Sequence, residues 1–152
     1  MSKMTKPINT NEKEDNQDTA RRDKGFENFC RLSGETDNAF EAFGPLGDMI
    51  LEFGFGDVYG RGGLGWRERQ IATMSIQIAQ GHLPQLHMHI HFSLNLGITI
   101  EEIEELILHT VPYSGFPPAM NAWKVLNEIK AELPAHSNKS EKEIKSHGTK
   151  HR

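Results

Sequence analysis

The sequence predicts an all-α fold, a compact bundle of about five or six helices. Apolar residues recur at the three- and four-residue spacing of amphipathic helices between residues 26 and 129. Glycine and proline residues interrupt this pattern at short intervals, as they do at turns between helices. Sustained alternation of apolar and polar residues, which is typical of strands, is missing. A chain of 152 residues suits one such domain.

The first predicted helices carry most of the phenylalanines. Helical spacing begins at Phe26 and ends at Gly34, and Asp37 is the expected N-cap of a second helix. Gly44-Pro45 interrupts that helix, and the apolar spacing resumes over residues 46–53. One small bundle could not cover all of these aromatic side chains, so we expect the chain to form a homo-oligomer.

The middle of the chain contains a glycine-rich stretch followed by a helix. Residues 54–65 contain six glycines and Tyr59, and they are predicted to form a loop. Glycine would let this loop approach a ligand closely, and a plain connection between helices is the equally supported alternative. From Trp66 to Gln80 the apolar spacing is helical, and Gly81 ends it.

Three further helices are predicted in the C-terminal half. Pro84 suits the first turn of a helix, and Gly97 suits the left-handed residue beyond its end. Thr99 and Glu102 have the spacing of a capping box, which indicates the start of the next helix. Residues 114–118 break the pattern before the last helix, which carries apolar residues as far as Ile129.

Polar segments flank the predicted domain and set its charge. Residues 1–24 and 135–152 contain almost no large apolar side chains and are expected to be disordered tails around a helical domain at 25–134. This domain contains 6 Lys and Arg residues against 14 Asp and Glu residues, a net charge of −8. Such an acidic domain is not expected to bind nucleic acid.

The cysteine count and hydropathy indicate the compartment. Cys30 is the only cysteine, so an intramolecular disulfide is impossible, in agreement with a reducing compartment. No stretch approaches 18 continuous apolar residues, and no apolar segment of a signal peptide follows the N-terminus. We therefore expect a cytoplasmic protein that does not bind membranes.

The helix after Pro84 contains three histidines that cannot form one site. His87 and His91 share a face at the spacing of helical zinc ligands, but a third ligand would have to come from His82 or His109. We therefore interpret His87 and His91 as ordinary polar residues and expect no metal, with metal binding as the less favoured alternative. His89 points about 160° away from them.

The polar residues that could lie near His89 suit acid–base chemistry. A half-buried histidine is most often held by a neighbouring group in a structural role. The alternative is a site in which Arg69 and Gln85 hold a carboxylate while His89 and His109, the latter four residues before Tyr113, move a proton.

A family resemblance supports the second interpretation. It covers about residues 45–130, including a lead-in from Gly54 to Leu64. The residues that carry it are Arg69-Gln-Ile, Gly81, Gln85-Leu-His-Met-His89, Leu94-Asn-Leu-Gly97-Ile-Thr-Ile-Glu101-Glu102-Ile, Leu108-His109-Thr, Tyr113-Ser-Gly115-Phe-Pro117 and Asn121-Ala. This pattern resembles the carboxymuconolactone decarboxylase family, which is similar in fold to the alkylhydroperoxidase D proteins. The resemblance implies all-helical subunits that assemble into trimers or hexamers.

The resemblance also separates two kinds of chemistry. The peroxidase branch uses a Cys-x-x-Cys pair, a glutamate on the preceding helix and a histidine. In this register the cysteine positions hold His82 and Gln85, the glutamate position holds Gln70, and His89 alone matches. Because no thiolate is available there, a peroxide-reducing antioxidant protein is the least favoured hypothesis.

The decarboxylase branch lacks those cysteines, as this chain does. The resemblance implies a lyase without a metal or organic cofactor that removes CO2 from a small cyclic carboxylate such as 4-carboxymuconolactone. It implies that Arg69 binds a carboxylate, His89 transfers a proton and His109 contacts a second proton or oxygen, while Gln85 and Tyr113 orient the substrate. A non-catalytic, oligomeric ligand-binding protein of the same fold is the alternative.

Overall fold

The computed structural model of the protein describes residues 10–133, and side chains from residue 19 onward. Its elements are α1 (Thr10–Ser33), the 3-10 helix η1 (Glu41–Phe43), α2 (Pro45–Met49), the π-helix η2 (Ile50–Val58), α3 (Trp66–Gln80), α4 (Leu83–Asn95), α5 (Ile100–Ser114) and α6 (Phe116–Glu132). Because these residues contain six α-helices and no strand, the all-α prediction is confirmed.

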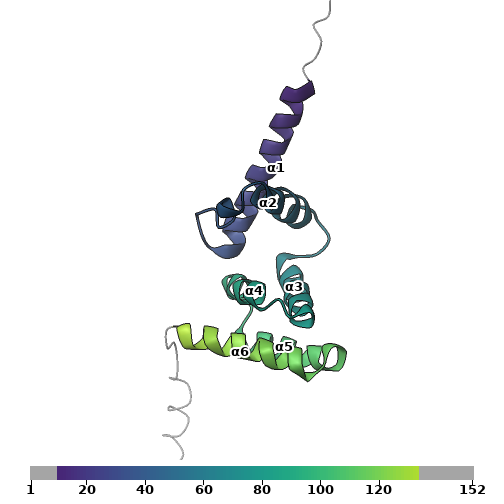
Figure 1. The fold of residues 1–152 in the computed structure, drawn as a ribbon, viewed down its shortest axis with the longest axis vertical. Helices are drawn as coiled ribbons and strands as arrows, with labels where there is room; N and C mark the ends of the chain where they lie inside the picture. Colours follow the sequence, from purple (N-terminus) through teal and green to yellow (C-terminus); the bar gives the residue numbers. More distant parts are fainter. Residues whose placement is uncertain (1–9, 134–152) are drawn as a thin grey trace, which may run out of the picture.

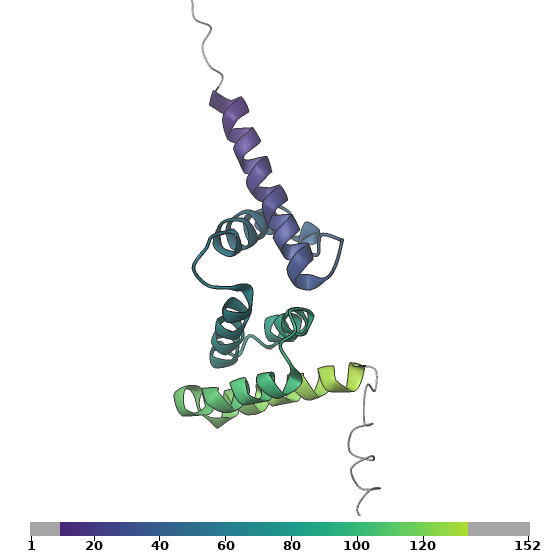
Figure 2. The same ribbon diagram turned by 180° about the vertical axis from the view of Figure 1, so that it is seen from behind.

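The helices form two packed groups joined through α4. In the first, α1 packs mainly on η2, and in the second, α3, α4, α5 and α6 pack on one another. Figures 1 and 2 show α5 and α6 side by side at one end of the molecule, with α3 and α4 between them and the α1–η2 group. None of the described helices combines the length and apolar composition needed to cross a membrane.

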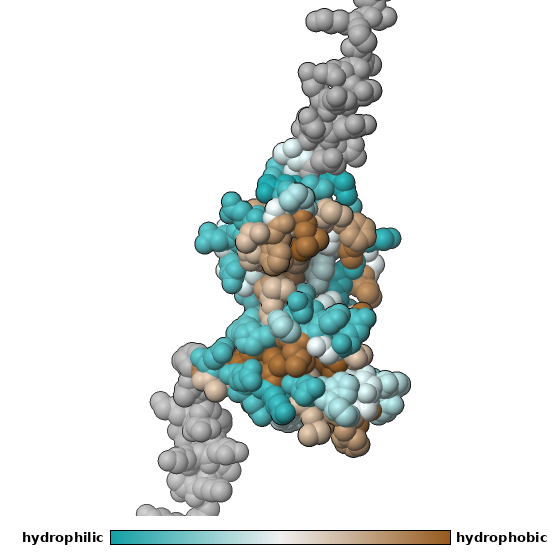
Figure 3. All heavy atoms as spheres, viewed as in Figure 1, coloured by the Kyte–Doolittle hydropathy of each residue, from teal (hydrophilic) through white to brown (hydrophobic). Residues whose placement is uncertain are grey.

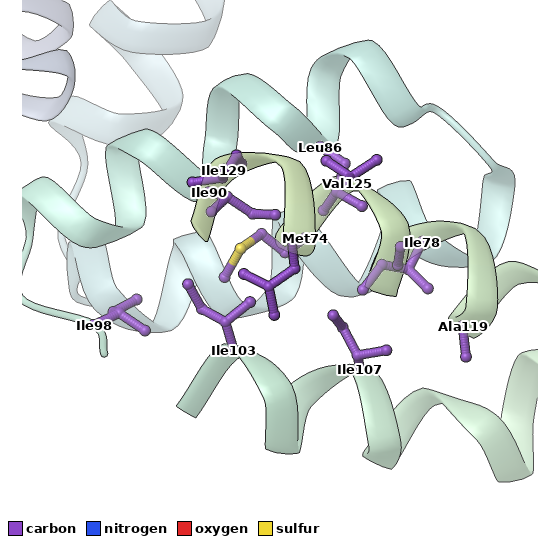
Figure 4. Packing of buried hydrophobic residues seen from close by; sticks show 12 residues of the cluster. Met74, Ile78, Leu86, Ile90, Ile98, Ile103, Ile107, Ala119, Val125 and Ile129 are labelled. Carbon is purple, nitrogen blue, oxygen red and sulfur yellow. The ribbon is translucent and has the colours of Figure 1, made fainter. Parts of the chain in front are cut away.

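The second group has an aliphatic core. Each of its four helices contributes residues from one face, as the helical apolar spacing predicts (Figure 4). The buried members are Met74, Ile78, Leu86, Ile90, Ile98, Ile103, Ile107, Ala119, Ala122, Val125, Leu126 and Ile129. This core fixes the orientation of α4 and therefore the direction in which its histidines point.

The first group has an aromatic core centred on Phe29 of α1. The ring of Phe29 makes edge contacts with Phe40, Phe55 and Phe92, at centroid distances of 5.0, 5.4 and 5.9 Å. Such edge-to-face pairs add to the stabilisation that comes from burial alone. Because Phe92 belongs to α4, this cluster joins α1 to the second group.

Glycines let α1 and η2 approach each other closely, and they correct the prediction of a loop at 54–65. A Cβ on Gly25 would overlap the carbonyl oxygen of Leu51, and one on Gly56 would lie 2.8 Å from the carbonyl oxygen of Arg21. Residues 54–60 are helical, and the loop contains only residues 61–65. The glycines serve this tight packing of helices, which local sequence patterns do not reveal.

Two further differences from the sequence analysis lie in the first group. Helix α1 begins at Thr10, so it includes residues 10–24, which were assigned to the N-terminal tail. Arg21 and Arg22 anchor it through ion pairs of 2.6 Å with Asp57 and Asp48. Residues 1–9, and the predicted tail at 135–152, lie outside the described residues.

The expected N-cap at Asp37 is wrong. The side-chain oxygen of Asn38 accepts the backbone N–H of Phe40 at 3.0 Å, and only the short helix η1 follows. An Asx turn has replaced a helix start, because Asn and Asp side chains suit both structures.

The helix ends of the second group follow the predictions. Pro84 lies in the first turn of α4, and Gly81 and Gly97 have φ values of 73° and 80°. Thr99 and Glu102 form the capping box, with hydrogen bonds of 3.2 and 2.9 Å. These local signals place α4 between fixed ends.

Apolar side chains also gather on the surface of the first group. Figure 3 shows them over α2 and its neighbours. The exposed large apolar residues of this region are Phe43, Leu46, Met49 and Phe53, each more than half exposed. The described chain does not cover this patch by itself.

Candidate functional site

His89 of α4 meets Gln70 of α3 inside the helical packing. Nδ1 of His89 lies 2.9 Å from Oε1 of Gln70, and the Gln70 side chain is fully buried. On its other side, Gln70 donates a hydrogen bond from Nε2 to the hydroxyl oxygen of Tyr59 at 2.8 Å. Tyr59 at the C-terminal end of η2, Gln70 of α3 and His89 of α4 therefore form one hydrogen-bonded chain.

The orientation of Gln70 fixes the tautomer of His89. Since the Gln70 amide nitrogen donates to Tyr59, its oxygen faces the imidazole, and Nδ1 must carry the proton that it donates. Nε2 of His89 is then an acceptor, and it has no hydrogen-bond partner in the described chain. It is not among the buried unpartnered atoms, so it is open to solvent or to a ligand.

The surroundings of His89 keep it neutral. Burial lowers the pKa of His89 to about 4, because an imidazolium loses its hydration there. The ring of Phe92 contacts it at a centroid distance of 5.2 Å, and Ser93 donates a hydrogen bond to its carbonyl oxygen at 2.7 Å. At neutral pH His89 is thus an oriented base with its proton acceptor exposed.

Arg69 borders the same chain of hydrogen bonds. Its guanidinium lies over the Tyr59 ring, 5.7 Å from the centroid, and donates to the carbonyl oxygens of Leu64 at 3.2 Å and Arg61 at 3.4 Å. Among residues 19–133 it has no carboxylate partner. A half-buried arginine without a counter-ion, next to a neutral histidine network, is suited to binding a carboxylate.

Tyr59 is buried enough to stay a phenol. Burial raises the pKa of Tyr59, more than its hydrogen bonds and the nearby Arg69 charge lower it. It therefore remains a neutral hydrogen-bonding group that supports Gln70 at neutral pH.

His109 and Tyr113 lie on α5, outside the His89 network. They contact each other on α5, with ring centroids 5.4 Å apart, and both side chains are exposed. His109 lines a hollow of about 330 Å³ whose other residues are Ile71, Met74, Ile98, Glu102, Glu105 and Leu106. In the part of the chain that the structure describes, no hydrogen bond or ring contact joins His109 or Tyr113 to His89.

Gln85 is exposed on the first turn of α4, one turn before His89. The structure thus places His89 in the Tyr59–Gln70 hydrogen-bonded chain and Arg69 over the Tyr59 ring, and it leaves Gln85, His109 and Tyr113 outside this network. Sequence reasoning missed the supporting residues Tyr59 and Gln70. The available signal for Gln70 was its place at the glutamate position of the peroxidase branch in the family resemblance.

The other face of α4 carries His87 and His91. Their rings lie 5.0 Å apart, which confirms that they share a face. Cys30, the only cysteine, is half-buried against the aromatic core of the first group. It has no second cysteine with which to form a disulfide.

Comparisons with known proteins match the part of the chain that contains this network. The family model "Carboxymuconolactone decarboxylase family" matches residues 45–128, a stretch that contains Tyr59, Arg69, Gln70 and His89. The chain is 34% identical over 86 residues to a 4-carboxymuconolactone decarboxylase of Acinetobacter baylyi, covering 57% of this chain and 64% of that protein.

Two further relatives are similar at the same level. A nitrosuccinic acid decarboxylase of Metarhizium robertsii is 33% identical over 89 residues, covering 56% of this chain and 62% of that protein. An uncharacterized 15.0 kDa protein of Paracoccus denitrificans is 33% identical over 85 residues, covering 55% and 63%. The match thus spans somewhat less than two thirds of each relative. Because the family model covers more than half of the chain, this protein belongs to the carboxymuconolactone decarboxylase family.

Proposed function

We propose that this protein is a decarboxylase of a small carboxylate such as 4-carboxymuconolactone, and that it needs no metal or organic cofactor for the reaction. The observation that carries the proposal is the neutral, oriented His89, joined through Gln70 to Tyr59, whose ring lies under the guanidinium of Arg69. Two similar proteins named as decarboxylases of 4-carboxymuconolactone and nitrosuccinic acid support the reaction type.

The reaction requires a group that accepts the electron pair of the broken C–C bond and a source of one proton. When a carboxylate leaves the lactone ring as CO2, the electron pair of the broken C–C bond moves into the ring and shifts its double bond. A proton must then be added to the carbon at the far end of that shift. One proton is consumed for each CO2 released, and an acid–base group near the ring supplies it.

His89 and Arg69 have complementary parts in this scheme. Arg69 binds a carboxylate of the substrate and holds the ring near Nε2 of His89. An anion placed beside His89 favours the imidazolium, so the bound substrate raises the pKa that burial lowers in the free protein. His89 then takes a proton from solvent at Nε2 and delivers it to the ring carbon.

The remaining candidates are assigned by their positions. Gln85, one turn before His89 and exposed, orients the substrate from the same helix. His109 and Tyr113 contribute from a neighbouring copy, because in the described chain they do not contact the His89 network. The exposed apolar patch of Phe43, Leu46, Met49 and Phe53 supports the homo-oligomer that this assignment needs.

The test is an ultraviolet assay of the purified protein with 4-carboxymuconolactone. We expect turnover in the natural protein and in His82→Ala, which removes an exposed histidine outside the network. His89→Ala should lower kcat by about 10²- to 10⁴-fold, with an unchanged circular dichroism spectrum and oligomeric state.

Two outcomes would contradict the proposal. Substrate binding without turnover in the natural protein would favour a non-catalytic ligand-binding protein. Full turnover in His89→Ala would show that another group supplies the proton.

A further inference from the structure

A second cluster of functional side chains lies on the face of α4 that points away from the His89 network. It consists of His87 and His91 of α4 and Glu132, the last residue of α6. Nε2 of each histidine is 3.9 Å from Oε2 of Glu132, and one ligand atom from each of the three residues lies within 4.8 Å of the others.

This combination is a known type of metal ligand set. Two histidines four residues apart on one helix, with a carboxylate from another helix, provide two imidazole nitrogens and one oxygen, which suits Zn²⁺. His82 and His109, the third ligands that the sequence suggests, do not belong to this cluster. Glu132 is far along the chain from both histidines, and only the packing of α4 on α6 brings it to them.

The spacing is close to what a tetrahedral zinc ion needs. Ligand atoms at ordinary Zn–N and Zn–O bond lengths lie about 3.3 Å apart. The observed 3.9 Å separations are too long for hydrogen bonds and can close through side-chain rotation alone. The three side chains are 38%, 41% and 59% exposed, so such rotation does not disturb the core.

The charges around the cluster favour a cation. Glu128 lies one turn before Glu132 and, with His87 and Lys124, lines a hollow of about 500 Å³ next to the cluster. Lys124 also lines this hollow. The charge of the nearby Lys130 is balanced by its ion pair with Glu104. The excess of acidic residues over the whole of 25–134 also attracts cations.

We infer that His87, His91 and Glu132 bind one divalent transition-metal ion of the zinc type, with water or Glu128 in the fourth position. The ion links α4 to the end of α6 on the side opposite His89, so it stabilises the fold and takes no part in decarboxylation. The inference therefore stands or falls independently of the proposed function.

The test uses the full chain after treatment with a chelator and dialysis. Zn²⁺ titration by calorimetry should show one site per chain, and bound Co²⁺ should give the visible absorption of a tetrahedral site. The thermal midpoint should rise with Zn²⁺ and stay unchanged with Mg²⁺, which prefers oxygen ligands. His87→Ala, His91→Ala and Glu132→Gln should each weaken zinc binding about tenfold or more.

His82→Ala is the matched control, since it removes a nearby exposed histidine outside the cluster. It should keep the affinity and the Co²⁺ spectrum of the natural protein. Equal zinc affinity in the natural protein and the His87→Ala/His91→Ala double variant would overturn the inference. An equal loss in His82→Ala would overturn it too. Glu132→Gln, a change at an exposed helix end, reports on the ligand set even if a histidine variant folds poorly.

Discussion

The two sides of α4 show how packing gives one residue type different chemistry. On one side, His89 is half-buried, held by Gln70 at Nδ1 and kept neutral, with its pKa lowered to about 4. On the other side, His87 and His91 are open to solvent and share Glu132 at 3.9 Å. In the proposed roles, the oriented nitrogen of His89 on the buried side transfers a proton, whereas the histidine nitrogens of the exposed side bind a metal.

The largest expected difference between the two sides is in stability. Ile90, which lies between His89 and His91 in the sequence, is fully buried in the aliphatic core. Ile90→Ala should lower the free energy of unfolding by about 2–5 kcal/mol, because it leaves a cavity. His91→Ala, in metal-free protein, should change it by less than about 0.5 kcal/mol. Urea unfolding measures both, and equal losses would show that the exposed side is also part of the packed core.

The buried side of α4 should make stability depend on pH. Unfolded His89 has the ordinary pKa of 6.5, whereas the folded value is about 4, so the unfolded state binds more protons between these pH values. Stability from this group is complete above about pH 6.5 and falls as the pH drops toward 4, by about 3 kcal/mol in total.

Urea unfolding at pH 7 and pH 4.5 tests this point. His89→Gln should remove most of the difference between the two pH values, whereas His91→Gln should preserve it. If His89→Gln keeps the full pH dependence, another group must be responsible for it.

The smallest of the three effects concerns the support of His89. Gln70→Leu removes the acceptor of Nδ1 and should lower kcat about 10- to 100-fold, as the loss of a group that orients a functional histidine does. Gln77→Leu is the matched control on the same helix, because the Gln77 Oε1 atom is buried without a partner in the described chain. That change should leave kcat unaltered and be neutral or stabilising. Similar kcat values for the two variants would contradict the orienting role of Gln70.

The features that sequence predicts well are those set by nearby residues. The capping box of Thr99 and Glu102 and the left-handed Gly97 follow from neighbours in the chain, and both are present. The sequence pattern predicts Gly56 as a loop residue, whereas its role is to fit η2 against α1. A glycine that allows close packing looks the same in sequence as one that allows a turn.

The candidate site likewise contains residues that the sequence predicts and contacts that it does not predict. Spacing and resemblance predict His89 and Arg69 as site residues, and in the structure His89 contacts Gln70 while Arg69 lies over the Tyr59 ring. The hydrogen bond between Gln70 and His89, and the approach of Glu132 to His91, depend on how separate helices pack. Such long-range contacts leave no periodic signal in one sequence, so the contacts themselves could not be predicted.

The aromatic cluster has a consequence for exchanging segments between related proteins. The family match begins at residue 45, after α1 has ended, yet Phe29 of α1 covers Phe55 and Phe92 inside the matched region. Phe92 in turn contacts the ring of His89. A chimera joined at the family boundary would therefore replace Phe29, which packs on the ring behind His89, so recombination experiments should transfer α1 together with the helices it covers.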